Sequence, residues 1–128
     1  MISADSLILI GEDEPDNQVI LQIVVESLLG VRAEVAGDGL AVLASVERER
    51  PRMILLDLMM PGLDGFEVTR QLKANPATAS IPIVAVSAMA RPDDRETALA
   101  AGCDDFVRKP FELDDLEAVI RTHLDARN

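Results

Sequence analysis

Short apolar segments alternate with longer amphipathic segments along the chain, and this order restricts the fold more than any other feature. The apolar segments of strand length are Leu7–Ile10, Ala33–Ala36, Met53–Leu56, Ile83–Val86 and Phe106–Val107. The segments with apolar residues at helical spacing are Pro15–Leu29, Leu40–Glu49, Phe66–Ala74, Pro92–Ala101 and Leu113–Leu124. Strands that alternate with helices favour a parallel sheet covered on both faces. The sequence therefore predicts an α/β fold, a doubly wound five-stranded parallel sheet with five helices.

The length of the chain and the lack of an internal linker predict one domain. Its 128 residues suit a single core, and no linker or repeat divides them, so we expect one domain over residues 1–128. No apolar run approaches the ~20 residues of a membrane-spanning helix, and the N-terminus does not resemble a signal peptide. The lone cysteine, Cys103, excludes an intramolecular disulfide and is expected to pack as a small apolar residue. These features predict a cytoplasmic protein without membrane insertion.

The charge of the chain argues against nucleic acid as a direct partner. Twelve basic residues stand against 23 acidic ones, which gives a net charge of −11. Such a chain repels phosphate backbones. With three Phe and neither Tyr nor Trp, it also has few of the aromatic side chains on which bases stack.

Polar and charged residues stand where four of the expected strands end. Glu12 and Asp13 follow the first strand, Asp57 the third, Ser87 the fourth and Lys109 the fifth. Right-handed crossovers bring the carboxyl ends of parallel strands to one edge, so we expect these side chains to converge there. Three carboxylates would repel one another, and a hard divalent cation such as Mg2+ relieves that repulsion. The sequence thus predicts a magnesium pocket with a lysine beside it.

With these residues in this order, the chain resembles the receiver domains of response regulators in two-component signalling, of the single-domain chemotaxis-like type. The matching motifs are Glu12-Asp13, Asp57 with Met60-Pro61-Gly62 and Asp64-Gly65 after it, Ser87-Ala88, and Lys109-Pro110-Phe111. The resemblance spans residues 7–124. It implies a flavodoxin-like sheet with strand order 2-1-3-4-5 and a protein without an output domain.

The resemblance also implies a role for each residue of the pocket. Asp57 would accept a phosphoryl group. Asp13 would bind Mg2+ directly, Glu12 would contribute through water, and Asp57 and the backbone carbonyl of Met59 would complete the protein ligands. Gly11 stands before Glu12 where a branched aliphatic residue is expected, and a glycine in a strand marks a close backbone approach or a bend.

Three further residues would act on the phosphoryl group or respond to it. Ser87 would hydrogen-bond the group and Lys109 would pair with it, and the Lys109–Pro110 peptide bond would be cis. Movement of the Ser87 hydroxyl would open space into which Phe106 turns, with a bias inward even before phosphorylation. This change would alter the face formed by the fourth helix, the fifth strand and the fifth helix, and so the binding of a partner protein.

The implied function is that of a bacterial phosphoacceptor signalling protein and not of a turnover enzyme. A histidine kinase or a histidine phosphotransfer protein would donate the phosphoryl group, and the domain would assist its own phosphorylation and dephosphorylation. The downstream protein target is not indicated by the sequence.

Two other functions remain open at this level. A magnesium-dependent phosphatase of the haloacid dehalogenase type also uses an aspartate at a strand end, but it needs a second acid at the position of Met59. A receiver-like module that binds partners without phosphorylation is the other alternative, and the intact set of pocket residues argues against it.

Three residues outside the motifs have simpler interpretations. Met59 and Met89 are interpreted either as apolar filler or as a shield over the phosphoryl group. His123 is interpreted as a solvated helix residue.

Overall fold

The structure, a computed structural model, describes residues 5–88 and 91–126 and shows within them one five-stranded parallel sheet. Its strands are β1 (Leu7–Gly11), β2 (Arg32–Ala36), β3 (Met53–Leu56), β4 (Ile83–Ser87) and β5 (Asp105–Arg108). They lie in the order β2-β1-β3-β4-β5, and every pair is parallel. The expected fold class and strand order are therefore confirmed.

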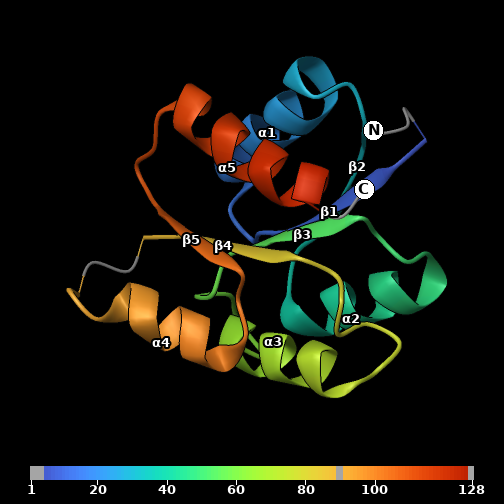
Figure 1. The fold of residues 1–128 in the computed structure, drawn as a ribbon, viewed down its shortest axis with the longest axis vertical. Helices are drawn as coiled ribbons and strands as arrows, with labels where there is room; N and C mark the ends of the chain where they lie inside the picture. Colours follow the sequence, from blue (N-terminus) through green and yellow to red (C-terminus); the bar gives the residue numbers. More distant parts are fainter. Residues whose placement is uncertain (1–4, 89–90, 127–128) are drawn as a thin grey trace.

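Helices cover both faces of this sheet (Figure 1). They are α1 (Pro15–Ile23), continued by the π-helical segment η1 (Val24–Leu28), then α2 (Gly39–Arg48), α3 (Gly65–Ala74), α4 (Asp94–Ala101) and α5 (Leu113–Ala126). Helices α1 and α5 lie on one face, and α2, α3 and α4 lie on the other. No helix in the described part of the chain has the length and hydropathy needed to cross a bilayer.

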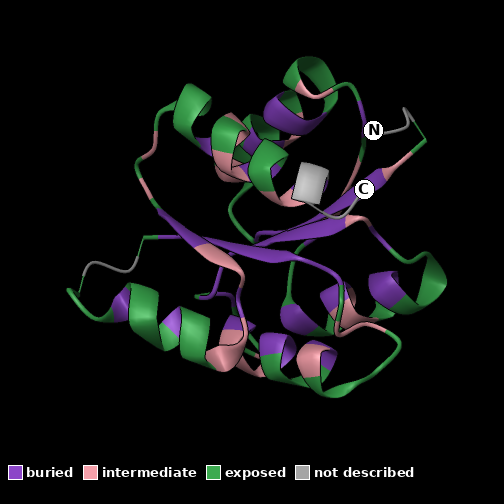
Figure 2. Ribbon diagram, in the orientation of Figure 1, coloured by how far each residue is buried: buried purple, intermediate pink, exposed green. Residues whose placement is uncertain are grey.

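The central strands are apolar along nearly their whole length because each of their faces packs against a layer of helices. In β1, Leu9 belongs to the core under α2, α3 and α4, whereas Ile8 and Ile10 belong to the core under α1 and α5. In β3, Ile54 and Leu55 divide in the same way. Figure 2 shows the resulting buried sheet between two layers of helices that are exposed on their outer sides. Continuous apolar runs of this kind are typical of parallel sheets.

Most boundaries differ from the sequence-based expectation by one or two residues, and at two helices a local contact explains the difference. The expected helix over 15–29 is present, but its end is wound as a π-helix, with the amide of Leu29 bonded to the carbonyl of Val24 at 3.1 Å. Helix α4 begins at Asp94 and not at Pro92, because the Asp94 side chain accepts the amide of Arg91 and closes a turn there. Strand β5 is one residue longer at each end than expected.

Candidate functional site

The strand register brings Glu12 and Asp57 together at the carboxyl edge of the sheet. Gly11 lies opposite Leu56, and the amide of Asp57 donates to the carbonyl of Gly11 at 2.8 Å. The amide of Glu12 in turn donates to Ala36 of β2 at 3.0 Å. A Cβ atom on residue 11 would come within 2.8 Å of the Leu56 side chain, so glycine permits close packing where the two strands enter the site.

Lys109 reaches both carboxylates from the end of β5. Its Nζ lies 2.6 Å from Oε1 of Glu12 and 3.1 Å from Oδ2 of Asp57. The backbone amide of Lys109 donates to the carbonyl of Ser87 at 2.9 Å, which fixes the end of β5 against β4. Glu12 is fully buried and Asp57 is 7% exposed, so the lysine is the nearby positive charge that compensates them. The Lys109–Pro110 bond is cis, as expected.

The second oxygen of Asp57 is held by neutral donors. Its Oδ1 accepts the Ser87 hydroxyl at 3.3 Å and the amide of Met59 at 2.9 Å. Ser87 is fully buried, whereas the side chain of Met59 is 63% exposed. Interpretation of Met59 as apolar filler is therefore wrong. Met89 lies outside the described residues.

The carboxylates of Glu12, Asp13 and Asp57 form a site of suitable chemistry for a metal ion. One oxygen from each lies within 4.8 Å of the others, and Asp13 is exposed to solvent while Glu12 and Asp57 are buried. Mg2+ prefers oxygen donors and keeps several of its waters, so a carboxylate cluster with one open side fits it. These residues fit the cofactor expected from the sequence.

The charges of the pocket perturb one another. Burial, with the nearby charge of Asp57, raises the pKa of Glu12, and the bonds from Lys109 and the Glu14 amide offset only part of this. Burial alone would lower the pKa of Lys109, but the bonds and charges of Glu12 and Asp57 outweigh it and raise that pKa. The site therefore holds one firmly charged ammonium against an excess of acidic groups, a balance that favours binding of a cation.

Two further residues support this site, and the sequence singles out only one of them. The side-chain amide of Gln18 donates to the carbonyl of Glu12 at 2.7 Å and ties α1 to the acidic pair. Gly65 begins α3 so close to the loop after β3 that a Cβ atom there would lie 2.9 Å from the carbonyl oxygen of Asp57. The sequence motif Asp64-Gly65 indicates the role of Gly65. Nothing in the sequence indicates the contact of Gln18, because polar residues are common on the exposed side of a helix.

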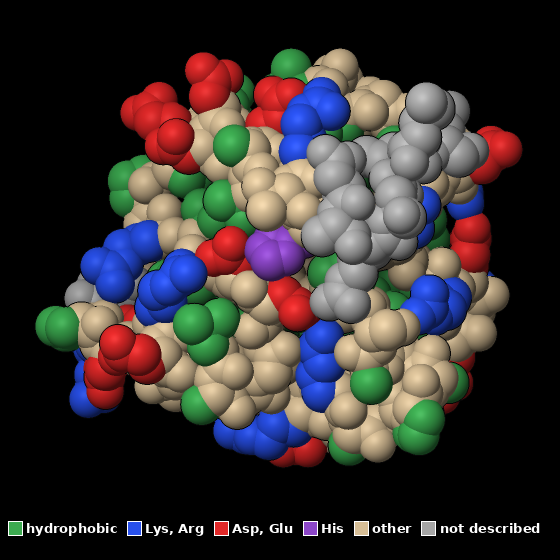
Figure 3. Space-filling model, in the orientation of Figure 1, with side chains coloured by type: hydrophobic (Ala, Val, Ile, Leu, Met, Phe, Trp, Pro, Cys, Tyr) green, Lys and Arg blue, Asp and Glu red, His purple; other side chains and the backbone are tan. Residues whose placement is uncertain are grey.

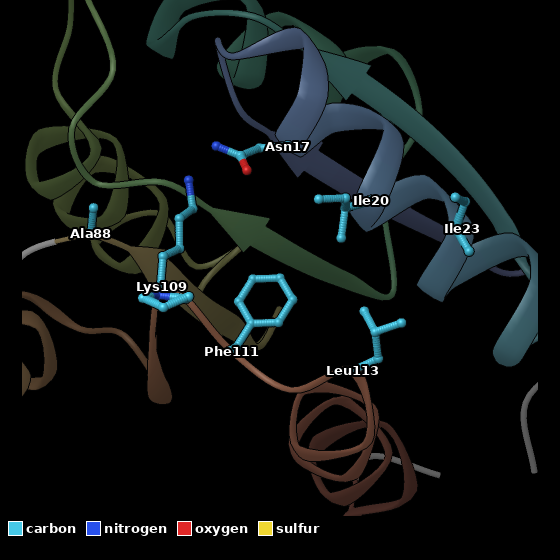
Figure 4. A pocket seen from close by; sticks show the side chains of 8 residues that line it. Asn17, Ile20, Ile23, Ala88, Lys109, Phe111 and Leu113 are labelled. Carbon is cyan, nitrogen blue, oxygen red and sulfur yellow. The ribbon is translucent and has the colours of Figure 1, made fainter.

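A mainly apolar groove lies beside the pocket, between α1 and the segment that precedes α5 (Figure 4). It has a volume of about 560 Å3 and shares Lys109 with the acidic site. Its apolar walls include Ile20 and Ile23 of α1 opposite Phe111 and Leu113. Both isoleucines are exposed, at 39% and 47%, so the groove is open to solvent.

Phe106, the expected switch residue, is 8% exposed and packs in the core under α2, α3 and α4. Cys103 is buried in the same core, as expected. His123 is not solvated as the sequence suggested, since its side chain is 20% exposed and its Nε2 lies 3.1 Å from Oδ2 of Asp105. A histidine on the polar side of an amphipathic helix gives no sequence signal for such a contact.

Comparisons with known proteins agree with this geometry. The family model for the response regulator receiver domain matches residues 8–121. The DNA-binding response regulator MtrA of Mycolicibacterium smegmatis is 38% identical over 117 residues, which cover 91% of this chain and 50% of that protein. A probable transcriptional regulator, ycf27 of Porphyridium aerugineum, is also 38% identical over 91% of this chain and 47% of its own length. The chain thus spans about half the length of these curated relatives.

Solved structures share the fold over nearly the whole chain. The receiver domain of the sensor histidine kinase PA1611 from Pseudomonas aeruginosa PAO1 has a TM-score of 0.86 and 36% identity, covers 95% of this chain and is itself covered to 99%. That crystal structure contains a magnesium ion coordinated in the active site cleft. A signal receiver domain of a histidine kinase from Syntrophus aciditrophicus has a TM-score of 0.87 and 30% identity. The match covers 94% of this chain and 91% of that domain. The chain belongs to the response regulator receiver domain family.

Proposed function

We propose that Asp57 of this receiver domain accepts a phosphoryl group from a histidine kinase or a histidine phosphotransfer protein, with Mg2+ held by Glu12, Asp13, Asp57 and the backbone carbonyl of Met59. The observation that carries the proposal is the contact of Lys109 with the Asp57 carboxylate inside a cluster of three acidic side chains. A magnesium ion in the active site cleft of the similar PA1611 domain supports the choice of metal. The groove beside Lys109 offers contact area to a protein donor.

The chemistry follows from the charges around Asp57. A carboxylate oxygen of Asp57 attacks phosphorus, a P–O bond forms, and the P–N bond of the phosphohistidine breaks with its electron pair leaving on the imidazole. Lys109 and the hydroxyl of Ser87 stabilise the negative oxygens that approach the buried carboxylate. When bound, Mg2+ supplies positive charge to the same oxygens. Attack by water on the aspartyl phosphate releases inorganic phosphate and restores the carboxylate.

The proposed output is a change on the face formed by α4, β5 and α5. Phosphorylation draws the Ser87 hydroxyl toward the phosphoryl group, and Phe106 occupies the space that this leaves. A partner protein then binds the altered face, so the domain acts as a signalling protein and not as a turnover enzyme. The exposed Met59 side chain slows the entry of water to the aspartyl phosphate. Single-domain organisation over residues 1–128 and a cytoplasmic location stay predictions.

Incubation with acetyl phosphate and Mg2+, followed by intact-mass measurement, tests the proposal. We expect one phosphoryl adduct on the wild-type protein, none on Asp57→Asn, and none when EDTA removes the metal. Asp38→Asn is the matched control, because Asp38 is an exposed aspartate that caps α2 and should leave the adduct unchanged.

Two outcomes would contradict the proposal. The absence of any adduct on the wild-type protein would favour a receiver-like module that binds partners without phosphorylation. An adduct that persists in Asp57→Asn would show that another residue accepts the phosphoryl group.

A further inference from the structure

A second pocket lies at the edge of the sheet opposite to the acidic site. It has a volume of about 340 Å3, and the residues that line it are Arg50, Arg52, Ser80, Ile81 and Pro82. Arg52 directly precedes β3 and Pro82 directly precedes β4, and these strands are parallel neighbours, so the pocket lies at their amino ends. The acidic site lies at their carboxyl ends. We call this set of residues the Arg50 pocket.

Arg50 differs in its partners from most arginines of the chain. Six others form an ion pair with a carboxylate, and these are Arg32, Arg48, Arg70, Arg91, Arg95 and Arg121. Figure 3 shows one face of the molecule, on which basic and acidic side chains are interspersed. Among the side chains that the structure describes, no carboxylate pairs with Arg50, whose partners are two neutral oxygens of the loop before β4. Its positive charge therefore lacks a described counter-charge.

The guanidinium of Arg50 is held in one orientation by these two bonds. Its Nε donates to the carbonyl oxygen of Ala77 at 3.3 Å, and its Nη2 donates to Oγ of Ser80 at 2.8 Å. The two N–H donors of Nη1 take part in neither bond. A hydroxyl that accepts from Arg50 also keeps its own O–H as a donor. The pocket thus offers donors from two side chains that already contact each other.

The loop that carries Ser80 is itself anchored to α3. Nζ of Lys73 donates to the carbonyl oxygens of Ala79 and Ile81, on either side of Ser80, at 3.2 and 2.8 Å. Ile81 and Pro82 are buried and give the pocket an apolar side. A ligand that binds donors fixed in this way does not have to order them, and that lowers the free-energy cost of binding.

We propose that the Arg50 pocket binds the phosphate group of a small molecule, with the guanidinium of Arg50 and the hydroxyl of Ser80 as donors. The planar fork of N–H groups on arginine matches the oxygens of phosphate. Phosphate also has more acceptor oxygens than a carboxylate, so it can accept from both side chains at once. Arg52 lines the same pocket and adds a second guanidinium to its walls. The net charge of −11 opposes the approach of an anion and limits the affinity.

Titration with inorganic phosphate in EDTA at constant ionic strength, followed by NMR of the backbone amides, tests the proposal. EDTA prevents metal-bound phosphate from entering the acidic site. We expect the amide signals of Ser80 and Ile81 to shift and to saturate with a Kd of about 1–10 mM, because few charge-assisted bonds contribute. Acetate offers fewer oxygens to the two donors, and its Kd should be at least about threefold higher.

Three variants make the result specific. Arg50→Gln should raise the Kd for phosphate about tenfold, and Ser80→Ala about threefold, because each loses a donor to the anion. Arg70→Gln is the matched control, since it removes the same charge from an exposed arginine outside the pocket and should keep the wild-type Kd. Circular dichroism checks that each variant is folded. Ser80→Ala leaves Arg50 in place and provides the test if Arg50→Gln does not fold.

Three outcomes would overturn the inference. The first is the absence of saturable shifts at Ser80 and Ile81 in the wild-type protein. The second is the same Kd for phosphate in wild type and in a folded Arg50→Gln or Ser80→Ala protein. The third is binding of acetate as tight as that of phosphate. The proposed function does not depend on the result, because phosphorylation of Asp57 requires neither of the two donors.

Discussion

Lys73 and Lys109 both form ion pairs with carboxylates that are shielded from solvent, yet the surroundings of the two ammonium groups differ. Nζ of Lys73 lies 3.0 Å from Oδ2 of Asp104 and donates to the carbonyls of Ala79 and Ile81 at 3.2 and 2.8 Å. An ammonium has three N–H donors, so each donor of Lys73 has a partner. One carboxylate and one ammonium also balance in charge, and this contact ties α3 to the start of β4 and the turn before β5.

Lys109 meets two carboxylates instead of one, and a third lies close to them. Both of its hydrogen-bonded partners, Glu12 and Asp57, are buried acidic groups. The negative charge around Lys109 therefore exceeds the positive charge. A balanced ion pair stabilises the fold, whereas an unbalanced one leaves an excess of negative charge, which favours the binding of a cation.

Replacement of the lysine in the unbalanced site should have the largest effect. In Lys109→Met the rate of phosphorylation by acetyl phosphate should fall about 100-fold, as when one donor is removed from a site that stabilises a developing negative charge. The rate is measured from the growth of the phosphoryl adduct by intact mass in saturating Mg2+. Lys73→Met is the matched control and should keep the wild-type rate at a temperature where it is folded. Equal losses in both variants would break the distinction between the two lysines.

Replacement of the lysine in the balanced site should affect stability instead. Lys73→Met leaves the Asp104 carboxylate and two carbonyl oxygens without this donor, and the free energy of unfolding should fall by about 2 kcal/mol, less than for a fully buried pair. Urea denaturation followed by circular dichroism measures this. The control is Arg70→Met on the same helix, since the exposed Arg70–Glu67 pair should contribute at most about 0.5 kcal/mol. A Lys73→Met protein as stable as Arg70→Met would show that the contact does not hold the fold.

Much of the fold could be predicted from the sequence because burial on both faces leaves a clear pattern. The run Met53–Leu56 is apolar at every position, and all four residues are fully buried in β3. Local side-chain contacts are harder to predict. Pro92 suggested a helix start, but Asp94 bonds to the amide of Arg91 and delays it. The π-helical turn of η1 has the same apolar spacing as an α-helix and so leaves no signal.

The candidate site could likewise be predicted only in part. The convergence of Asp57, Ser87 and Lys109 follows from strand order, and strand order follows from the alternation of elements, so the sequence could predict that these residues meet. The roles given to them stay predictions. The contacts made by Gln18 and His123 depend on the reach of single side chains between separate elements, and no spacing in the sequence encodes that reach.

The third prediction concerns the extra carboxylate that separates the two lysine sites, and its effect should be the smallest. The pKa of Glu12 is raised above its ordinary value of 4.5, chiefly by burial. The folded protein therefore binds this proton more tightly than the unfolded chain does. The contribution of Glu12 to stability is then fullest below pH 4.5 and declines as pH rises through the folded-state pKa. Lys109 and the Glu14 amide offset part of the effect of burial, which limits the decline.

Glu12→Gln removes this titration and keeps a side chain of similar size. In metal-free buffer we expect the free energy of unfolding of wild type, taken relative to Glu12→Gln, to decrease from pH 4.5 toward pH 8 in urea denaturation experiments. Saturating Mg2+ should weaken or reverse the decrease, because the metal binds the folded protein with Glu12 ionised. A difference that is constant with pH, or that rises in metal-free buffer, would mean that the acidic excess around Lys109 costs the fold nothing. The contrast with the balanced Lys73 site would then rest on reactivity alone.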